Sequence, residues 1–440
     1  MKVYVRTFGC RANHYDSETV RAMVESAGHL VVARPADADV AVFNSCAVTA
    51  EAEADLRQSV RRAAREQPAL RTVIMGCASA LPDLGGSRSL RSLPTVERLV
   101  PGAAFSEVAD ALALPSTPEI ARAWQQTTAR AVLRIQDGCD EHCTFCATTL
   151  ARGANRSRPL ADLLREALVL AESHAEIVLT GIHIGTYGHD SGSSLGELLE
   201  ALANALPAAR FRLSSLEATE VDERLFELLT GHPLRVAPYL HAPLQSGSDR
   251  LLRRMGRHWY TADAYARALE RIAARSAVFG FGCDLITGFP GETETDHAET
   301  MALVARLPFT HLHVFPFSAR PGTAAVRLPD PVAPADADRR ARELRELGDA
   351  KAAAYRLSRH GGLADVVVVR AGGIDPGSAE GLTEDYLTVR LLNPRMSRGS
   401  RVPARLRMVG RQLMADTRHL DALAQADTTL APPLTNHRAV

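Results

Sequence analysis

The sequence predicts an α/β protein in three parts: an amino-terminal doubly wound parallel sheet, a central partial β/α barrel and a small carboxyl-terminal antiparallel β-barrel. Strand-like and helical segments alternate up to residue 328, which is typical of parallel sheets. Residues 329–334 interrupt this alternation, and the short strands expected after residue 360 are punctuated by Gly and Pro, as in small antiparallel barrels. We expect the parts to span residues 1–120, 128–355 and 358–417, followed by a tail at 418–440.

Composition restricts the class of protein. The chain has 440 residues, of which 46% are hydrophobic and 23% charged, as in an ordinary globular protein. Its formal net charge is zero, so any contact with nucleic acid must come from local basic patches. Residues 1–6 lack the apolar core of a signal peptide, and no apolar run approaches the roughly 18 residues of a membrane span. We therefore expect a cytoplasmic protein with no membrane contact.

The amino-terminal part contains three predicted strands, and a cysteine closely follows each of them. A helical pattern over 15–27 follows the first strand, and a helix that begins after Thr49 and ends before Pro68 follows the second. Parallel strands present their carboxyl ends at one edge of a sheet, so we expect the three cysteines to meet in space. The alternative is three unrelated core cysteines. The strands are 2–7, 40–43 and 72–75, and the cysteines are Cys10, Cys46 and Cys77.

The central part shows six strand-like runs that alternate with helical stretches, which predicts a full or partial β/α barrel. In such a barrel the chemistry lies at the carboxyl ends of the strands. A charged helix is expected over 336–360, and short strands over 364–370, 386–392 and 402–409. The six runs are 131–135, 176–179, 211–213, 239–240, 283–286 and 311–315.

A short loop in the central part carries Cys139, Cys143 and Cys146, separated by three and two residues. Three thiolates at this spacing can hold three irons of a [4Fe–4S] cluster and leave the fourth iron open to a ligand. The alternative is zinc, with His142 or His174 as the fourth ligand. Zinc sites favour paired Cys-x-x-Cys units, however, and the sequence has no second pair.

The chain has seven cysteines, an odd number. In a cytosolic protein thiols stay reduced, so metal, cluster or catalytic roles are considered before disulfides. Cys283 lies in a predicted strand without a partner, and we expect a core thiol there because free cysteine packs like a small hydrophobe.

Six further segments match segments of one protein family in their residue types and in their order along the chain. Together with the cysteine loop they resemble the radical SAM methylthiotransferases, and the resemblance covers residues 1–410. The chain departs from the family pattern at Ala147, Thr148 and Thr149, where an aliphatic pair and a proline are usual, and this change concerns the wall of the S-adenosyl-L-methionine (SAM) pocket. The segments are 151–158, 179–182, 213–217, 241–248, 284–293 and 315–323.

The resemblance implies two [4Fe–4S] clusters and SAM as cofactors. One SAM would supply a methyl group and a second a 5′-deoxyadenosyl radical, so that a methylthio group reaches an unactivated carbon. The first cluster would be the catalytic one, at which SAM is cleaved. The ligand sets implied are Cys139, Cys143 and Cys146 for the first cluster, and Cys10, Cys46 and Cys77 for the second.

The resemblance also implies partners and further site residues. The last strands are similar to the family's RNA-binding TRAM barrel, which implies the anticodon stem-loop of tRNA as a partner, and the chemistry implies an electron donor such as flavodoxin or ferredoxin. Polar or small residues at strand ends are candidates for SAM binding. Arginines after the cysteine loop suit RNA phosphate or the SAM carboxylate, with a solvated charged loop as the alternative. The candidates are Thr180, Gly181, Glu217, Gln245, Ser246 and Arg152, with Arg156 and Arg158 nearby.

Segments 8–18, 46–62 and 135–139 favour the branch of the family that acts on N6-threonylcarbamoyladenosine in tRNA. We predict that this base, at position 37 beside the anticodon, is converted to its 2-methylthio derivative in a single-stranded loop, where bases can be splayed out. The alternatives are methylthiolation of isopentenyladenosine in tRNA or of an aspartate in a ribosomal protein. A non-catalytic iron–sulfur RNA-binding protein is the alternative from another class. The sequence leaves the oligomeric state open.

Overall fold

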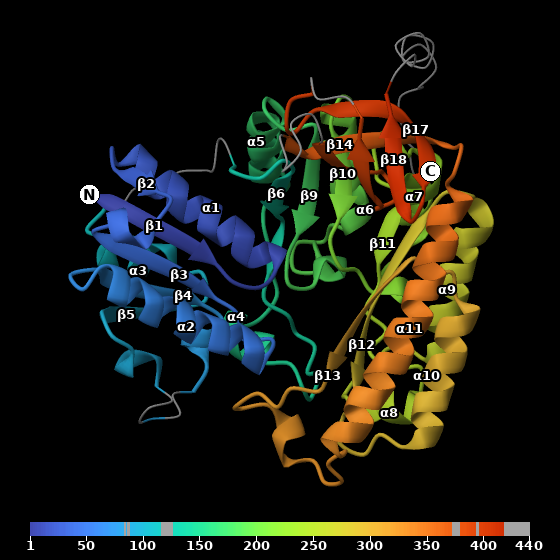
Figure 1. Cartoon of the computed structure of the whole chain (residues 1–440), viewed down its shortest axis with the longest axis horizontal. Helices are drawn as coiled ribbons and strands as arrows, with labels where there is room; N and C mark the ends of the chain where they lie inside the picture. Colours follow the sequence, from blue (N-terminus) through green and yellow to red (C-terminus); the bar gives the residue numbers. More distant parts are fainter. Residues whose placement is uncertain (83–84, 86–88, 116–125, 372–378, 393–395, 418–440) are drawn as a thin grey trace.

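The computed structural model describes residues 1–82, 85, 89–115, 126–371, 379–392 and 396–417 and has the predicted three-part α/β architecture (Figure 1). The amino-terminal sheet lies to one side of the barrel strands, and the carboxyl-terminal barrel packs on their end (Figure 1). The predicted tail at 418–440 lies outside the described residues, as do 116–125, where the first boundary is expected. None of the described helices is long and apolar enough to cross a membrane.

The amino-terminal sheet has five parallel strands in the order β2-β1-β3-β4-β5. Alternate residues of β3 face two apolar layers, because successive side chains of a strand point to opposite faces. Val40 and Val42 pack with α1 and α3, whereas Ala41 and Phe43 pack with α2. The elements are β1 (Lys2–Thr7), α1 (Arg11–Ser26), β2 (Leu30–Val32), β3 (Val40–Ser45), α2 (Ala50–Glu66), β4 (Arg71–Gly76), β5 (Val96–Pro101) and α3 (Phe105–Ala111).

The predicted strands and both helices of this part are present, with two differences. Helix α1 begins at Arg11 rather than at residue 15, while α2 begins after Thr49 as expected, with the Thr49 hydroxyl accepting a hydrogen bond from Ala52 N. β2, β5 and α3 were not predicted. β2 has no buried residue and β5 has one, so their sequences lack a clear hydrophobic alternation.

The six barrel strands lie where the sequence predicts them. They form two three-stranded parallel sheets, β10-β9-β6 and β11-β12-β13. Isolated bridges connect β10 to the segment just before β11 (Phe211 to Val236) and the residue two after β10 to β11 (Ser215 to His241). Among the described residues no pairing joins β6 to β13, so the barrel is partial, as predicted. The strands are β6 (Ala131–Arg134), β9 (Glu176–Thr180), β10 (Arg210–Leu213), β11 (Tyr239–His241), β12 (Gly280–Thr287) and β13 (His311–Pro316).

Helices cover the outer face of these strands (Figure 1). Between strands and helices lies the largest apolar core of the protein, which includes Leu133, Phe211 and Leu285. Cys283 is fully buried in this core, which confirms the predicted core thiol. The helices are α5 (Leu160–Ala171), α6 (Leu195–Ala205), α7 (Glu223–Gly231), α8 (Asp249–Arg254), α9 (Ala262–Arg275), α10 (Glu294–Arg306) and α11 (Pro334–Ser358).

The carboxyl-terminal strands form a closed barrel in the order β14-β15-β16-β18-β17. The expectation of a purely antiparallel barrel needs one correction, because β16 and β18 pair in parallel where the chain closes the barrel. β15 and β18 were not predicted. The strands are β14 (Leu363–Ala371), β15 (Ala379–Leu382), β16 (Thr388–Leu391), β17 (Arg401–Val409) and β18 (Gln412–Asp416).

The turn between β15 and β16 packs under the central strands. The ring of Tyr386 stacks on Tyr239 of β11, with 4.3 Å between centroids. Arg212 of β10 donates a hydrogen bond to the Thr383 carbonyl at 3.1 Å. A Cβ on Gly280 would lie 2.2 Å from the Asp385 carbonyl oxygen, so this glycine allows the turn to approach β12. The small barrel is therefore seated directly on the amino ends of the barrel strands.

Candidate functional site

Cys10, Cys46 and Cys77 follow the carboxyl ends of β1, β3 and β4, which are neighbours in the sheet. The three cysteines, which we term the strand-end triad, therefore gather at one edge, as the predicted topology requires. Cys46 and Cys77 are buried, and Cys10 is exposed.

Asn13, on the first turn of α1, lies among these thiols. Its Oδ1 is 3.9 Å from Cys10 Sγ and 4.0 Å from Cys77 Sγ. Its Nδ2 donates hydrogen bonds of 2.8 Å to the carbonyls of Phe8 and Ser45, which stand two residues before Cys10 and one residue before Cys46. One buried amide thus fixes the spacing of the strand ends.

Gly9 makes room for the thiol of Cys46. Its φ of +96° is in the left-handed region, which favours glycine. A Cβ on Gly9 would lie 2.6 Å from Cys46 Cβ and 2.7 Å from Cys46 Sγ. Cys10 and Cys46 can therefore approach each other only if the residue between strand and cysteine has no side chain.

Arg152 reaches the strand-end triad from the neighbouring part of the chain. Its Nε donates a hydrogen bond to Cys77 Sγ at 3.4 Å, and one terminal nitrogen contacts Asn13 Oδ1 at 2.7 Å and Asp16 Oδ2 at 2.6 Å. The Arg152 side chain is only 1% exposed. Burial raises the pKa of Cys77 to about 11, and Arg152 opposes this effect. Since the thiolate is the metal-binding form of cysteine, the guanidinium favours the form that binds iron.

Cys139, Cys143 and Cys146, which we term the loop triad, lie between β7 (Gln136–Asp137) and α4 (Thr148–Arg152). Backbone hydrogen bonds hold the loop at both sides: Cys139 N donates to Gly153 O at 3.0 Å, and Thr144 N donates to Met255 O at 2.8 Å. All three cysteines are partly exposed.

Two basic side chains contact the loop triad. His183 Nδ1 lies 3.6 Å from Cys139 Sγ, and a terminal nitrogen of Arg257 donates to Cys143 Sγ at 3.4 Å. Burial raises the pKa of Cys143 to about 12, while Arg257 acts to lower it. Burial lowers the pKa of His183, but hydrogen bonds to Cys139 and Glu220 outweigh burial and raise it to about 10. The loop triad therefore also has cationic donors beside its sulfurs.

The two triads lack the close sulfur spacing of a zinc site. Tetrahedral zinc at a Zn–S distance of about 2.3 Å would bring its sulfurs to about 3.8 Å from one another. Among the described residues, neither triad brings its three sulfurs within 4.8 Å of one another. His174, one proposed zinc ligand, instead bonds to the carbonyls of Leu170 and Thr128.

The candidates near β9 and β10 lie beside the segment that leads into the loop triad or beside Arg257, which contacts the loop triad. Thr180 ends β9, and Gly181 packs on Gln136: a Cβ on Gly181 would lie 2.7 Å from Gln136 Oε1. The Glu217 carboxylate pairs with Arg257, which also donates to a loop-triad sulfur. Burial raises the pKa of Glu217, although Arg257 opposes it.

Gln245 and Ser246 lie in the turn after β11. Gln245 has a φ of +64°, which is uncommon outside glycine, and its backbone N donates to Asp284 O at 2.8 Å. The buried Ser246 hydroxyl lies 3.3 Å from Thr300 Oγ1 of α10 and accepts a hydrogen bond from Ser248 N. Ser246 therefore supports the turn, and Gln245 joins it to β12.

The three arginines after the loop lie in different surroundings. Arg152 is buried against the strand-end triad, so it cannot face RNA. Arg158 pairs with Glu166 at 2.6 Å and donates to Tyr15 Oη at 3.1 Å. Arg156 is the exposed member, with 61% of its side chain accessible.

Sequence reasoning missed Asn13, His183 and Arg257, which contact the cysteines. Asn13 stands three residues after Cys10, at the start of a helix that follows a strand end. His183 follows the β9 strand end by three residues, so position alone could have suggested it. Arg257 had no such signal, because it lies after α8 and reaches Cys143 only through the fold.

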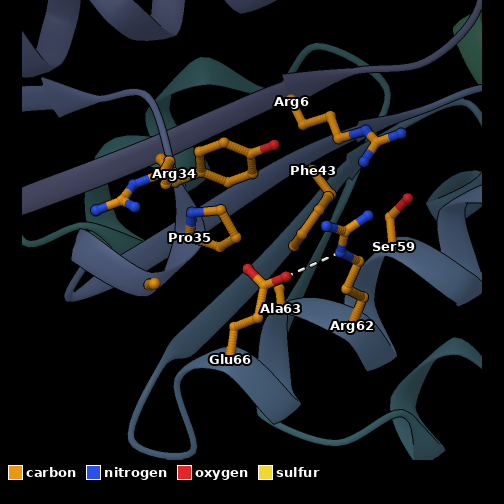
Figure 2. A pocket seen from close by; sticks show the side chains of 10 residues that line it. Arg6, Arg34, Pro35, Phe43, Ser59, Arg62, Ala63 and Glu66 are labelled. Atoms are coloured by element: carbon orange, nitrogen blue, oxygen red, sulfur yellow. Dashed lines mark hydrogen bonds and ion pairs between the residues drawn. The ribbon is translucent and has the colours of Figure 1, made fainter.

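A separate pocket of about 460 Å³ lies between β1, β3 and α2 (Figure 2). Tyr4, Phe43 and the arginines Arg6, Arg34 and Arg62 line it. Arg34 pairs with Asp37, and Arg62 pairs with Glu66. No cysteine lines this pocket, so it is distinct from both triads.

Two family descriptions match the chain, one over each triad. Residues 2–89 match the description "Uncharacterized protein family UPF0004", and residues 133–304 match the "Radical SAM superfamily". A solved structure of the radical S-adenosylmethionine methyltransferase TsrM from Kitasatospora setae, with cobalamin and a [4Fe-4S] cluster bound, has the same fold, with a TM-score of 0.54 at 15% identity over 74% of this chain and 76% of that one. The fold and the loop triad thus define a radical SAM enzyme.

Two curated relatives show to which family of radical SAM enzymes the chain belongs. The threonylcarbamoyladenosine tRNA methylthiotransferase MtaB of Thermotoga maritima is 34% identical over 74% of this chain and 77% of its own length. MtaB of Rickettsia prowazekii is 35% identical over 73% and 77%. The chain belongs to the radical SAM methylthiotransferase family. It is an enzyme of this class and uses SAM and [4Fe–4S] clusters.

Proposed function

We propose that the protein converts N6-threonylcarbamoyladenosine at position 37 of tRNA to its 2-methylthio derivative. The relatives that cover most of the chain are named for this substrate. The observation that carries the proposal is the presence of two cysteine triads in one molecule. Helix α4, which follows the loop triad in the chain, packs on Cys77 of the other triad and ends at Arg152, which donates to the same sulfur. Two neighbouring triads match a reaction that needs both a radical and a sulfur to transfer.

The six cysteines of the two triads are the proposed cluster ligands. Each triad would bind three irons through thiolates and leave the fourth iron of its cluster without a cysteine ligand. When they are bound to the protein, SAM and the two clusters would supply the radical, the methyl group and the sulfur. Arg152, His183 and Arg257 would hold the thiolates by charge-assisted hydrogen bonds, which are stronger than neutral ones.

Thr180, Gly181 and Glu217 are the proposed walls of the SAM pocket, because they adjoin the loop triad. Gln245 and Ser246 would act through the shape of their turn. The proposed domains span 1–120, 128–355 and 358–417. The closed barrel of the last domain would hold the anticodon stem-loop and so present the unpaired base 37 to the central domain.

The enzyme would also need an electron donor and a cellular location that keeps its thiols reduced. A flavodoxin or ferredoxin would deliver the electrons, because SAM cleavage needs a strong reductant. A cytoplasmic location fits seven free cysteines and a tRNA substrate.

The test is turnover on defined RNA. The full chain with reconstituted clusters would be incubated anaerobically with SAM, dithionite and anticodon stem-loops that carry threonylcarbamoyladenosine or isopentenyladenosine, and nucleosides would be identified by mass spectrometry. We expect 2-methylthio product from the first RNA. Product from the second RNA alone, or modification of ribosomal protein alone, would favour the other branches, and RNA binding without SAM cleavage would favour a non-catalytic protein.

A further inference from the structure

The central strands carry a group of polar side chains on the face opposite the helices. On β12, Cys283 and Leu285 are buried in the apolar core, so Asp284 between them points to the other face. His241 of β11 and His313 of β13 flank this carboxylate. His241 Nε2 and His313 Nδ1 each lie 3.0 Å from Asp284 Oδ1. We term these three residues the inner-face cluster.

The inner-face cluster is open to a ligand. The His313 side chain is 46% exposed and that of Asp284 is 26% exposed, whereas His241 is buried at the base of the group. Phe315, two residues further along β13, is also exposed. A carboxylate on the middle strand of a sheet is normally covered, so its accessibility here marks a surface that can receive a molecule.

Aromatic and basic groups from the other two parts of the protein extend the cluster. Tyr239 Oη lies 3.3 Å from His241 Nδ1, and the ring of Tyr386 stacks on Tyr239. Arg11 donates a hydrogen bond to Tyr386 Oη at 3.0 Å. The amino-terminal domain, the barrel and the small carboxyl-terminal barrel therefore all contribute to one polar surface.

Short connections link the inner-face cluster to both triads. Arg11 directly follows Cys10 of the strand-end triad. On the other side, the His241 carbonyl accepts a hydrogen bond from Leu216 N at 2.9 Å. Glu217 follows Leu216 and pairs with Arg257, which donates to a sulfur of the loop triad. A ligand held by the cluster would therefore lie near the residues that serve both proposed clusters.

We propose that the inner-face cluster binds the threonylcarbamoyl group of the substrate base, an inference that rests on the proposed function. This group has ureido N–H donors and a carboxylate. Asp284 can accept hydrogen bonds from the ureido N–H groups, and Arg11 can donate to the carboxylate. Both ring nitrogens of His313 are already engaged, Nδ1 with Asp284 and Nε2 with His311 Nε2 at 2.7 Å, so His313 orients the Asp284 carboxylate. Binding the side chain in this way positions the adenine between the two triads.

The same chemistry explains selection among modified bases. An isopentenyl group has no hydrogen-bonding atoms, and it would cover Asp284 and Arg11 without satisfying them. A site built to hydrogen-bond a substrate group rejects analogues that lack this group strongly, because its own polar atoms then lose their partners. The inner-face cluster would therefore separate the threonylcarbamoyl substrate from the isopentenyl one.

The test is binding of three anticodon stem-loops, which carry threonylcarbamoyladenosine, isopentenyladenosine or adenosine at position 37, to the full chain with reconstituted clusters. We expect the wild type to bind the first RNA at least about tenfold more tightly than the third, the scale of one hydrogen bond to a charged group. Asp284→Asn and His313→Phe should each remove most of this preference while cluster absorption and binding of the adenosine RNA stay unchanged. His189→Phe, which changes an exposed histidine outside these strands, is the matched control and should keep the preference.

Each other result overturns the inference. Equal affinity of the wild type for the first and third RNAs would exclude the subsite, even if the first RNA were still methylthiolated, so the proposed function would survive. Turnover of the isopentenyl RNA alone would instead refute the proposed function. Two imidazoles and a carboxylate with ligand atoms within 4.8 Å of one another could also hold a divalent ion. If the protein bound one zinc ion per chain in addition to the cluster iron, and His313→Phe lost this zinc, the inner-face cluster would be a metal centre and not a substrate subsite.

Discussion

The two cysteine triads reach similar arrangements by opposite routes. The loop triad is local: three and two residues separate its cysteines, and backbone hydrogen bonds hold the loop in place. The strand-end triad is assembled by a parallel sheet, which brings Cys10, Cys46 and Cys77 together from three strands. A local motif needs only its own spacing, whereas a dispersed site depends on the register and packing of a whole domain.

The two triads are alike in their electrostatics. In each, one guanidinium donates to one buried or half-buried sulfur at 3.4 Å: Arg152 to Cys77, and Arg257 to Cys143. Arg257 belongs to the same part of the chain as its cysteine, but Arg152 crosses from the central domain to the amino-terminal one. The dispersed site therefore also depends on how the two domains pack.

The largest effect is expected from removing one ligand of each triad. Cys139→Ala should abolish both SAM cleavage and methylthiolation, whereas Cys10→Ala should abolish methylthiolation and leave SAM cleavage intact. Iron should fall from about eight to about four atoms per chain in each variant. Iron analysis and assays of 5′-deoxyadenosine and nucleoside products measure these quantities. Full methylthiolation by Cys10→Ala would refute the role of the strand-end triad.

Single-glycine insertions should show that the loop triad depends on its local spacing and the strand-end triad does not. One glycine inserted between Glu141 and His142 changes the spacing of the loop triad and should eliminate SAM cleavage. One glycine inserted after Ala69, in the exposed turn between α2 and β4, lengthens a connection without moving a strand end and should cost less than about 1 kcal/mol of stability. Iron content and SAM cleavage report on both. Loss of the strand-end cluster in the Ala69 insertion would contradict the comparison.

Glycine substitutions should perturb one triad at a time. A Cβ on Gly9 would meet Cys46, and a Cβ on Gly138 would lie 1.9 Å from Ala154 O, so Gly9→Ala and Gly138→Ala should each lower the free energy of unfolding by about 1–3 kcal/mol and lose one cluster. Gly28 also has positive φ, but a Cβ there would meet no atom within 4 Å, so Gly28→Ala is the matched control and should cost about 1 kcal/mol without iron loss. Urea unfolding of the iron-free chain gives these energies. Retention of both clusters in Gly9→Ala would show that the close approach is not needed.

The smallest effect concerns the cationic donors. A guanidinium beside a thiolate favours the reduced, more negative cluster, so Arg152→Gln should lower the reduction potential of the strand-end cluster by on the order of 60 mV, which corresponds to a tenfold change for one electron. Arg257→Gln should do the same for the loop cluster alone. Arg156→Gln removes an exposed charge and is the control. Titrations followed by electron paramagnetic resonance measure the potentials, and equal shifts of both clusters in Arg152→Gln would contradict the assignment.

Most of the fold could be predicted from the sequence, because strands such as β3 and β9 are buried over their whole length and appear as apolar runs. β2, β5, β15 and β18 could not, since they are short or partly exposed and take their place from neighbouring strands. Among the site residues, the cysteines could be predicted from spacing and from strand ends. Arg152 could be singled out as a functional residue, but its direction toward Cys77 could not, because a side chain's target across a domain interface has no sequence signal.

The sequence by itself determined the loop triad, the strand ends that carry the other three cysteines, and the family to which the chain belongs. These features depend on local spacing and on hydrophobic periodicity, which adjacent residues encode. Only the tertiary structure decided that Arg152 reaches Asn13 and Cys77 and that His241, Asp284 and His313 meet on one face of the barrel. Such contacts join residues far apart in the chain. Strand pairing in the central sheet brings His241, Asp284 and His313 together, and the packing of the amino-terminal part on the central part brings Arg152 to Asn13.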